Sequence, residues 1–208
     1  MPIDDRPTLA APDDDPYLWL EDIEGARALD FVDAQNGRTL LAFGGTPFAA
    51  DRDALAAIYD RPDNIPFVTR NGGRLYNLWK DANNPRGLWR RTSLASFRTQ
   101  SPEWETLLDL DRLAADEDAD WLLNWTTTRP GGHPRAIVSL SRGGSDAVTL
   151  REFDMDRKTF ISDGFVLPEA KGGADWIDDD TLLLASAFGE GFVTTSGYAR
   201  GVRLWRRG

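Results

Sequence analysis

The sequence predicts a mainly all-β fold: a partial β-propeller of four-stranded antiparallel blades, preceded by a short α-helical N-terminal segment. Apolar residues recur at helical spacing near the N-terminus, whereas from about residue 64 the chain consists of short runs rich in β-branched and aromatic residues. Many short strands with frequent turn signals suggest an all-β sandwich, barrel or propeller, and their grouping in sets of about four approximates the blade period of a propeller. We therefore expect an N-terminal segment over residues 1–62 and the first two to three blades over residues 64–208.

Two helices are expected in the N-terminal segment. The first lies in YLWLEDIEGARALDFVDAQNG (residues 17–37), where helical spacing is carried by Ala28, Leu29, Val32 and Gln35. We expect Asp22 to cap the start of this helix and Asn36-Gly37 to end it. The second lies in FAADRDALAAIYD (residues 48–60), whose apolar face consists of Leu55, Ile58 and Tyr59.

The β region divides into three expected groups of strands, each bounded by turn sequences. The first runs from about Ile65 to Leu110 and comprises IPFVTR, RLYNLWKD, GLWRRTSL and EWETLLDL, with a hairpin at Asn71-Gly72-Gly73. The second runs from about Trp121 to Phe160 and comprises ADWLLNWTTT, RAIVSLS, AVTLREFD and KTFI. The third starts near Ala174 and comprises GADWID, DTLLLASAF and GVRLWRRG. DLDRLAADEDADW would be an acidic connection between the first two groups. Because the chain stops directly after a strand, we expect it to be the N-terminal piece of a longer protein.

Composition excludes several classes of protein. The formal net charge of -10 disfavours a nucleic-acid partner, because phosphate binding needs a basic surface. The chain has no cysteine, which excludes disulfides, thiolate metal sites and a cysteine nucleophile, and its one histidine, His133, excludes a multi-histidine metal site. The first residues lack the apolar core of a secretory signal, and no apolar run approaches the ~18 residues that a membrane helix needs. We expect a cytoplasmic protein without a membrane partner.

Ser145 is the residue whose neighbours most suggest chemistry. It follows Gly143 and Gly144, as in the Gly-x-Ser-x-Gly elbow that presents the nucleophile of α/β-hydrolases, but Ala147 occupies the last position. The alternating pattern after Ser145 predicts a strand, and a turn between two strands is a hairpin rather than an elbow. We therefore interpret Ser145 as part of a hairpin turn in which the glycines adopt positive φ.

The remaining candidates for chemistry are weaker. His133 lies in the loop sequence RPGGHPRA and could act as a base only if Ser145 were a nucleophile, so we interpret it as a solvent-exposed loop residue. The acidic clusters at residues 13–15, 116–118 and 178–180 do not match the spacing of a calcium loop. GGTPF and FGEGF are too short for a phosphate-binding loop. We assign no catalytic, cofactor-binding or metal-ligating residue, expect no cofactor, and leave substrate-binding residues open.

Tryptophan is unusually frequent, with eight residues. Seven of them lie in or beside candidate strands: Trp79, Trp89, Trp104, Trp121, Trp125, Trp176 and Trp205. They could form an aromatic platform for sugars or peptides, or they could fill the core between packed sheets. We favour core filling, because large aromatic side chains bury much surface.

Three stretches in this order resemble the prolyl oligopeptidase family of serine peptidases. DDDPYLWLEDIEGARALDFVDAQN (residues 13–36) is similar to the family's N-terminal segment, in which an Asp-Pro-Tyr-x-Trp-Leu-Glu-Asp run leads into a helix ending Gln-Asn. The Ser-x-Gly-Gly-Ser-Asp-Ala run followed by Arg151-Glu152-Phe153-Asp154 resembles a propeller segment of the bacterial members. TSGYARGVRLWRRG (residues 195–208) is similar to a later propeller strand.

The resemblance implies a peptidase that cleaves short peptides, typically after proline, with a Ser, Asp, His triad in an α/β-hydrolase domain. A seven-bladed propeller covers the active site of such enzymes and limits entry to small peptides. Residues 1–62 would then be the hydrolase-associated segment. The family's triad lies C-terminal to everything in this chain, and its nucleophile sits in a Gly-Gly-Ser-x-Gly-Gly elbow that residues 143–147 match only in their first three letters. No catalytic residue is therefore carried over.

We expect the chain to be a scaffolding and access-restricting part of such a peptidase, and to be inactive alone. Its partners would be an oligopeptide substrate and the C-terminal hydrolase domain of the same polypeptide. Exposed strand edges would also favour self-association. The alternative is a stand-alone, tryptophan-rich all-β module that binds glycans or peptides.

Overall fold

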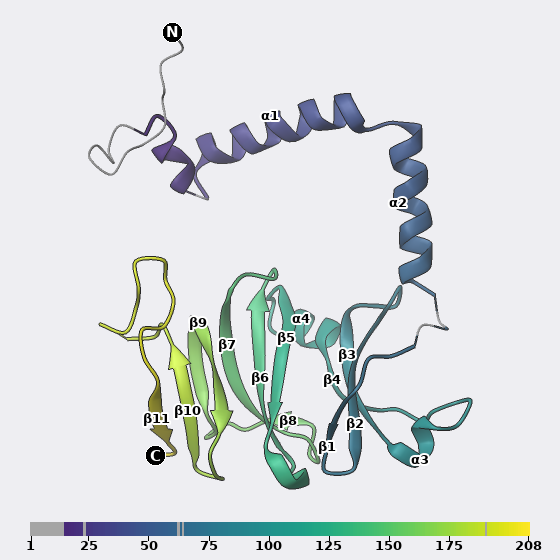
Figure 1. Cartoon of the computed structure of the whole chain (residues 1–208), viewed down its shortest axis with the longest axis vertical. Helices are drawn as coiled ribbons and strands as arrows, with labels where there is room; N and C mark the ends of the chain where they lie inside the picture. The colour runs from purple at the N-terminus through teal and green to yellow at the C-terminus, as the bar shows by residue number, and fades with distance from the viewer. Residues whose placement is uncertain (1–14, 23, 62, 64, 190) are drawn as a thin grey trace. The chain divides into compact units, whose positions relative to one another are not determined.

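The computed structural model describes residues 15–22, 24–61, 63, 65–189 and 191–208. The chain forms two compact units, residues 1–59 and residues 60–208. Figure 1 shows helices in the first unit and antiparallel sheets in the second. The mainly β architecture with short N-terminal helices is the fold class that the sequence predicts.

The N-terminal unit contains a short 3-10 helix, Leu18–Glu21, followed by α1 (Ala26–Phe43) and α2 (Thr46–Tyr59). The expected cap of the first helix is wrong: α1 begins after Gly25, no side chain caps it, and Asp22 contributes only its backbone carbonyl to the Gly25 N–H. In the described part of the chain, no helix has both the length and the apolar character that crossing a membrane requires.

The expected end of the first helix is also wrong. α1 continues through Asn36-Gly37 to Phe43, where the Gly44 N–H donates to the Leu40 carbonyl over 2.8 Å. One glycine inside a helix costs only about 1 kcal/mol relative to alanine, and the residues that follow, RTLLAF, include good helix formers. The glycine was therefore too weak a signal to stop the helix.

The first sheet has the order β1-β2-β3-β4 and is antiparallel, which confirms the expected first group of four strands. Its strands are β1 (Thr69–Asn71), β2 (Arg74–Asp81), β3 (Asn84–Ser93) and β4 (Glu105–Asp109), with a short helix α3 (Leu94–Phe97) before β4. Gly72 and Gly73 have φ values of 53° and 79°, as a two-residue hairpin turn requires. The first strand is shorter than expected, since residues 65–68 are not paired and Pro66 has no amide to donate.

The connection between the first two groups is a helix, α4 (Leu110–Asp116), which the sequence analysis did not expect. The Asp109 carboxylate caps its start by accepting the Arg112 N–H over 3.0 Å. At its end, the Ala119 N–H donates to the Ala114 carbonyl while Asp118 adopts a positive φ of 47°. This bond and the left-handed residue before it form a Schellman C-cap.

The second sheet contains seven strands in the order β11-β10-β9-β7-β6-β5, with β8 paired to β7. The strands are β5 (Trp121–Thr128), β6 (Arg135–Arg142), β7 (Ala147–Asp154), β8 (Thr159–Phe160), β9 (Val166–Trp176), β10 (Thr181–Ser186) and β11 (Arg203–Arg206). The expected gap between the second and third groups is wrong. Residues 166–171 of β9 pair with β7 and residues 172–176 pair with β10, so β9 belongs to both ladders.

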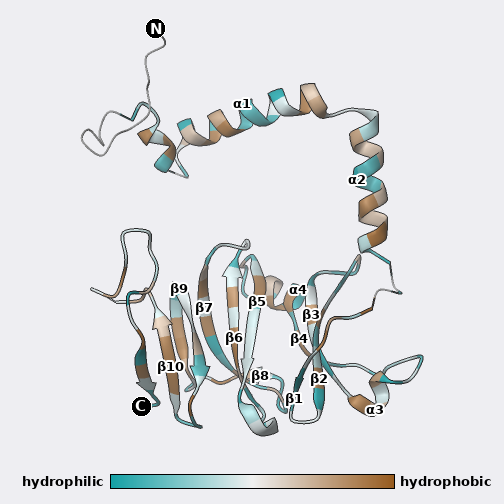
Figure 2. Cartoon of the chain, viewed as in Figure 1, coloured by the Kyte–Doolittle hydropathy of each residue, from teal (hydrophilic) through white to brown (hydrophobic). Residues whose placement is uncertain are grey.

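β6 lies at the centre of the hydrophobic core and is buried on both faces. Ala136, Val138 and Leu140 contribute to a cluster that includes residues of the first sheet, such as Trp89. Ile137 points to the other face and joins a cluster with residues of β9 and β10. This two-sided burial explains why the β6 sequence, AIVSLS, shows no alternation of apolar and charged residues. In Figure 2, hydrophobic colour also marks β10, whose Leu182 and Leu184 complete the second cluster.

Candidate functional site

The turn around Ser145 is a hairpin, as expected. It joins β6 to β7, and Gly143 and Gly144 have φ values of 58° and 84°. The Ser145 N–H donates to the Arg142 carbonyl over 3.1 Å, and the Ser145 hydroxyl donates to the Ala147 carbonyl over 3.0 Å. The hydroxyl is exposed and is occupied within its own turn, so its geometry is that of a turn residue.

Ser145 and His133 lie at opposite ends of β6. The strand has eight residues, and at ~3.3 Å per residue it separates its two ends by about 26 Å. A nucleophile and its base must lie within about 3 Å of each other, so these two residues do not form a catalytic pair. His133 lies in a loop, as expected, but its side chain is half-buried, at 34% exposed, and its Nε2 lies 3.4 Å from the Asp179 carboxylate. The loop before β6 places it against the turn between β9 and β10.

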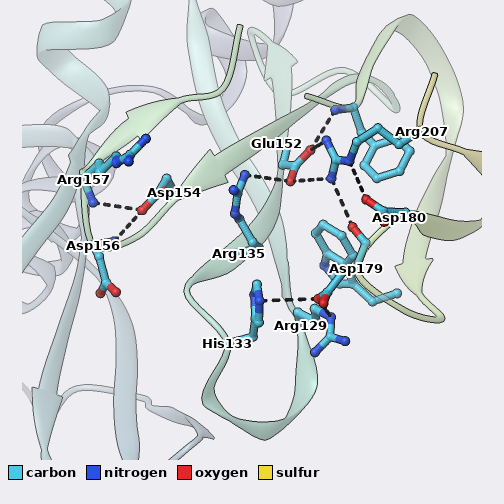
Figure 3. Close-up of polar contacts among 12 residues, drawn as sticks. Arg129, His133, Arg135, Glu152, Asp154, Asp156, Arg157, Asp179, Asp180 and Arg207 are labelled. Carbon is cyan, nitrogen blue, oxygen red and sulfur yellow. Dashed lines mark hydrogen bonds and ion pairs between the residues drawn. The ribbon is translucent and has the colours of Figure 1, made fainter. Parts of the chain in front are cut away.

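The fully buried carboxylate of Glu152 is the centre of a polar cluster at this end of the sheet (Figure 3). Arg207 donates to both carboxylate oxygens, from Nη1 to Oε2 over 2.8 Å and from Nη2 to Oε1 over 3.0 Å. Arg135 of β6 donates to Oε1 over 3.2 Å, and the Phe165 backbone N–H donates to Oε2 over 2.9 Å. Each oxygen therefore accepts two hydrogen bonds, which is what a buried charge requires.

Arg207 makes further polar and cation–π contacts in addition to those with Glu152. Its Nε donates to Asp180 over 3.0 Å, Nη2 also donates to the Asp179 backbone carbonyl over 3.1 Å, and the guanidinium lies 4.5 Å from the centre of the Phe165 ring. Hydrogen bonds to Glu152 and then Asp180 raise the pKa of Arg207, against the opposing effect of burial. The residue after β11 is thus attached to β7 as well as to β10.

A cleft of about 350 Å³ lies beside this cluster and is lined by His133, Arg135, Ile161, Asp163, Asp179, Asp180 and Arg207. Asp179 lies 2.6 Å from Arg129 Nε, an ion pair rather than an aligned hydrogen bond because that Nε has no partner with hydrogen-bond geometry. The carboxylates of Glu152, Asp179 and Asp180 are all paired with cations. This arrangement is an ion-pair network that joins β6, β7, the turn before β10 and the residue after β11.

The acidic clusters have structural partners. Glu117 accepts the Trp121 indole N–H over 2.8 Å and pairs with Arg151 at 2.8 Å. Hydrogen bonds from the Asp180 backbone and the Thr181 side chain lower the pKa of Asp178. Asp13 and Asp14 fall outside the described residues. Within the part of the chain that the structure describes, no group of three His, Cys, Asp or Glu side chains is placed to hold a metal ion.

None of the eight tryptophans is exposed, and Trp89, Trp121 and Trp176 are buried. The Arg90 guanidinium lies between two indoles, 4.4 Å from the Trp79 ring and 4.2 Å from the Trp104 ring. Burial between them lowers the pKa of Arg90 to about 10. Three tryptophans therefore belong to the core, as expected, and the other five are half-buried, so the eight do not form a fully exposed aromatic platform.

The sequence profile described as "Prolyl oligopeptidase, N-terminal beta-propeller domain" matches residues 10–208. The chain belongs to this propeller family. It is 36% identical over 210 residues to the uncharacterized peptidase y4nA of Sinorhizobium fredii, a match that covers 99% of this chain and 29% of that protein. It is 28% identical to an uncharacterized peptidase of Rickettsia prowazekii, covering 91% of this chain and 28% of that protein.

Solved structures agree with the family assignment. A post-proline cleaving enzyme from Rickettsia typhi superimposes with a TM-score of 0.80 at 28% identity, over 91% of this chain and 29% of that one. Oligopeptidase B from Leishmania major, at 15% identity and a TM-score of 0.66, shares the fold. The chain thus spans less than a third of the length of these relatives. The Glu152 cluster of this propeller chain was not predicted from the sequence. The sequence did contain a signal for it: in the alternating pattern of β7, the charged Glu152 falls on the same inward face as Val148 and Leu150.

Proposed function

We propose that the chain is the N-terminal and propeller part of a prolyl oligopeptidase-like serine peptidase, in which it supports a catalytic domain and restricts its access to short peptides. The observation that carries this proposal is the family match over residues 10–208, in a chain that spans 29% of a post-proline cleaving enzyme. A propeller that admits only short peptides needs a rigid wall. Strands such as β6, which is buried on both faces, would supply that rigidity. We also propose a cytoplasmic location, in keeping with a sequence that has no cysteine.

A hybrid enzyme tests the proposal. The segment of the Rickettsia typhi enzyme that corresponds to this chain is replaced by residues 1–208, and folding of the hybrid is checked by circular dichroism. We expect the hybrid to cleave a proline-containing pentapeptide and to leave a folded protein substrate intact. A folded hybrid that does not cleave the pentapeptide, or that degrades both substrates alike, contradicts the proposal.

The isolated chain is proposed to be inactive. A chromogenic peptide with one proline is incubated with the wild-type chain and with Ser145→Ala. Because the Ser145 hydroxyl is occupied in its own turn, neither protein should release the chromophore. Turnover by the wild type that Ser145→Ala abolishes would mean that this serine is a nucleophile after all.

The exposed apolar side chains of the N-terminal helices support a partner there. Leu41 is 90% exposed and Phe43 is 79% exposed, which is unusual for two large apolar residues so close together. We propose that this helix surface packs on the C-terminal hydrolase domain of the same polypeptide. In the hybrid, Leu41→Lys should weaken the association between the two parts, measured as a lower midpoint of thermal unfolding, whereas Asn36→Lys on the same helix should not.

Self-association of the isolated chain is proposed through β11. This strand ends the sheet, so one of its edges is unpaired, and Leu204 on it is 59% exposed. Light scattering at high concentration should detect oligomers that Leu204→Lys reduces. A monomer at every concentration contradicts this part of the proposal. We favour this proposal over a tryptophan-rich binding module, because three of the tryptophans are buried and the other five are only half-exposed.

A further inference from the structure

A cavity of about 430 Å³ opens between the first sheet and β5 of the second. The residues that line it include four aromatics, Phe67, Tyr76, Trp89 and Trp125. The volume falls within the range of pockets that hold small ligands, and such pockets are typically apolar with a few placed polar groups. The cavity thus has the size and the lining of a binding pocket.

No charged side chain lines this cavity. Four other cavities of the described chain each include charged residues, among them Arg86, Arg135, Arg112 and Arg91. Charged residues make up 28% of the sequence, so an uncharged lining of this size stands apart from the rest of the surface. A ligand matched to it would itself be uncharged where it contacts the walls, because a charge placed there would lose its hydration without gaining a partner.

Asn124 supplies the polar group at the cavity wall. Leu123 pairs with Leu140 and Trp125 pairs with Ser139, so Asn124 is the extra residue of a β-bulge in β5. Bulges redirect a side chain and are frequent beside binding sites. Asn124 is exposed, and its side-chain amide has no hydrogen bond among the described residues. It offers both donors and an acceptor, as a peptide backbone requires.

Phe67 forms the rim of the cavity and is held there by its backbone. The Asn77 side chain donates to the Phe67 carbonyl over 2.8 Å, and Asn77 accepts from Arg90 over 2.9 Å. The backbone is thereby fixed, while the Phe67 ring remains 96% exposed. An exposed aromatic ring on a fixed backbone is suited to contact a ligand.

We propose that this cavity is a subsite for an uncharged, proline-containing segment of the peptide substrate. Aromatic-lined grooves recognise proline segments because these are already ordered and offer flat, apolar rings. Phe67 and Trp125 would contact the pyrrolidine rings, and the Asn124 amide would hydrogen-bond the peptide backbone. The inference deepens the proposed function and rests on it, since that function supplies the peptide.

Direct binding to the 208-residue chain tests the subsite. The probe is the peptide acetyl-Ala-Pro-Phe-Pro-Ala-amide, followed by chemical shifts of the Asn124 amide and the Trp125 indole N–H. Phe67→Ala and Asn124→Ala should each weaken binding about tenfold, the loss expected when one contact or hydrogen bond of ~1.4 kcal/mol is removed. Phe67 is so exposed that its removal leaves folding unchanged. The proline-free peptide acetyl-Ala-Ala-Phe-Ala-Ala-amide should bind more weakly than the proline peptide.

Two substitutions serve as matched controls. Ile65→Ala removes an apolar side chain that is 88% exposed and lies two residues from Phe67 but does not line the cavity. Asn83→Ala removes an exposed asparagine in the turn between β2 and β3. Both should bind the proline peptide like the wild type. If the controls weaken binding as much as the cavity variants, or if chitotetraose binds the cavity more tightly than the peptide, the subsite is not one for proline peptides.

The subsite and the proposed function can fail separately. In the hybrid enzyme, Phe67→Ala should raise KM for the pentapeptide and leave kcat unchanged. If the hybrid cleaves the pentapeptide with the same KM in wild-type and Phe67→Ala forms, the subsite is overturned while the proposed function stands. If the hybrid is inactive although the isolated chain binds the peptide at Phe67 and Asn124, the proposed function fails and the cavity is a peptide site of another kind.

Discussion

Glu152 on β7 and Arg207 after β11 form a two-point ion pair, with donor–acceptor distances of 2.8 and 3.0 Å. The carboxylate is fully buried, whereas the Arg207 side chain is 30% exposed. Removing one partner of a buried pair costs ~3–5 kcal/mol because the other charge is left uncompensated. Here Arg135 remains, and Arg207 is partly exposed, so a smaller loss is expected.

Arg207→Gln should lower the free energy of unfolding by about 2–3 kcal/mol. Arg206→Gln is the matched control, because Arg206 is the exposed neighbour and makes no ion pair in the described structure; its effect should stay within ~0.5 kcal/mol. Urea denaturation measures both. Equal effects of the two variants would mean that Arg207 contributes no more than a surface charge.

Gly72 and Gly73 test how closely the first hairpin approaches the loop between β5 and β6. Both have positive φ, but a Cβ on Gly72 would lie 2.1 Å from the Gly132 Cα, whereas a Cβ on Gly73 would meet nothing within 4 Å. Gly73→Ala should cost ~1 kcal/mol through the left-handed backbone alone. Gly72→Ala should lower the free energy of unfolding by at least ~2 kcal/mol more than Gly73→Ala, because the backbone at residue 72 or at Gly132 has to shift to make room for the new Cβ. Similar urea midpoints for the two variants would rule out this close contact.

Asp118 offers a stabilising substitution. It occupies the left-handed position of the α4 C-cap, where glycine is preferred, and its negative charge lies at the negative end of the helix dipole. Asp118→Gly should raise the free energy of unfolding by about 1 kcal/mol. Asp118→Ala removes the charge but also replaces a residue that tolerates the left-handed region with one that does not, so it should be less stable than Asp118→Gly. A higher midpoint of thermal unfolding for Asp118→Gly than for the wild type and for Asp118→Ala checks the assignment.

Asp81 makes stability depend on pH. Hydrogen bonds from the Trp79 indole and then the Asn84 side chain lower the pKa of Asp81 in the folded chain. Its stabilising effect is therefore complete above the unfolded pKa of about 3.9, and it is lost as the pH falls through the lower folded value. Asp81→Asn should be less stable than wild type at pH 6 and should lose less stability between pH 6 and pH 3.

The control for this measurement is Asp163→Asn, at an exposed carboxylate without a hydrogen bond in the described structure. Its stability should change with pH in parallel with the wild type. If the stability of Asp81→Asn also changes with pH in parallel with that of the wild type, then the hydrogen bonds to Asp81 do not favour its ionised form in the folded state.

The strands were predictable because turn chemistry and β-branched runs are local signals. Gly143-Gly144 and Gly72-Gly73 indicate hairpin turns by themselves, because the positive φ values of these turns favour glycine whatever the rest of the fold is. α4 was missed although Asp109, Leu110, Leu113 and Ala114 carry a cap and a helical stripe, because the density of acidic residues suggested a loop. The contact of Glu152 with Arg207 joins residues 55 positions apart, and no local pattern specifies such a partner. The cavity beside Asn124 depends on a bulge, whose position is set by the pairing of two strands rather than by one of them.

The shared strand β9 has a consequence for how this part of the chain can be divided. The first half of β9 pairs with β7 and its second half pairs with β10. Because the two ladders share this strand, separating one of them would disturb the other. We expect residues 121–206 to exchange their amide hydrogens as one cooperative unit. A split-protein reporter, or a recombination between relatives, should therefore tolerate a junction near α4 and should fail when the junction is placed inside β9.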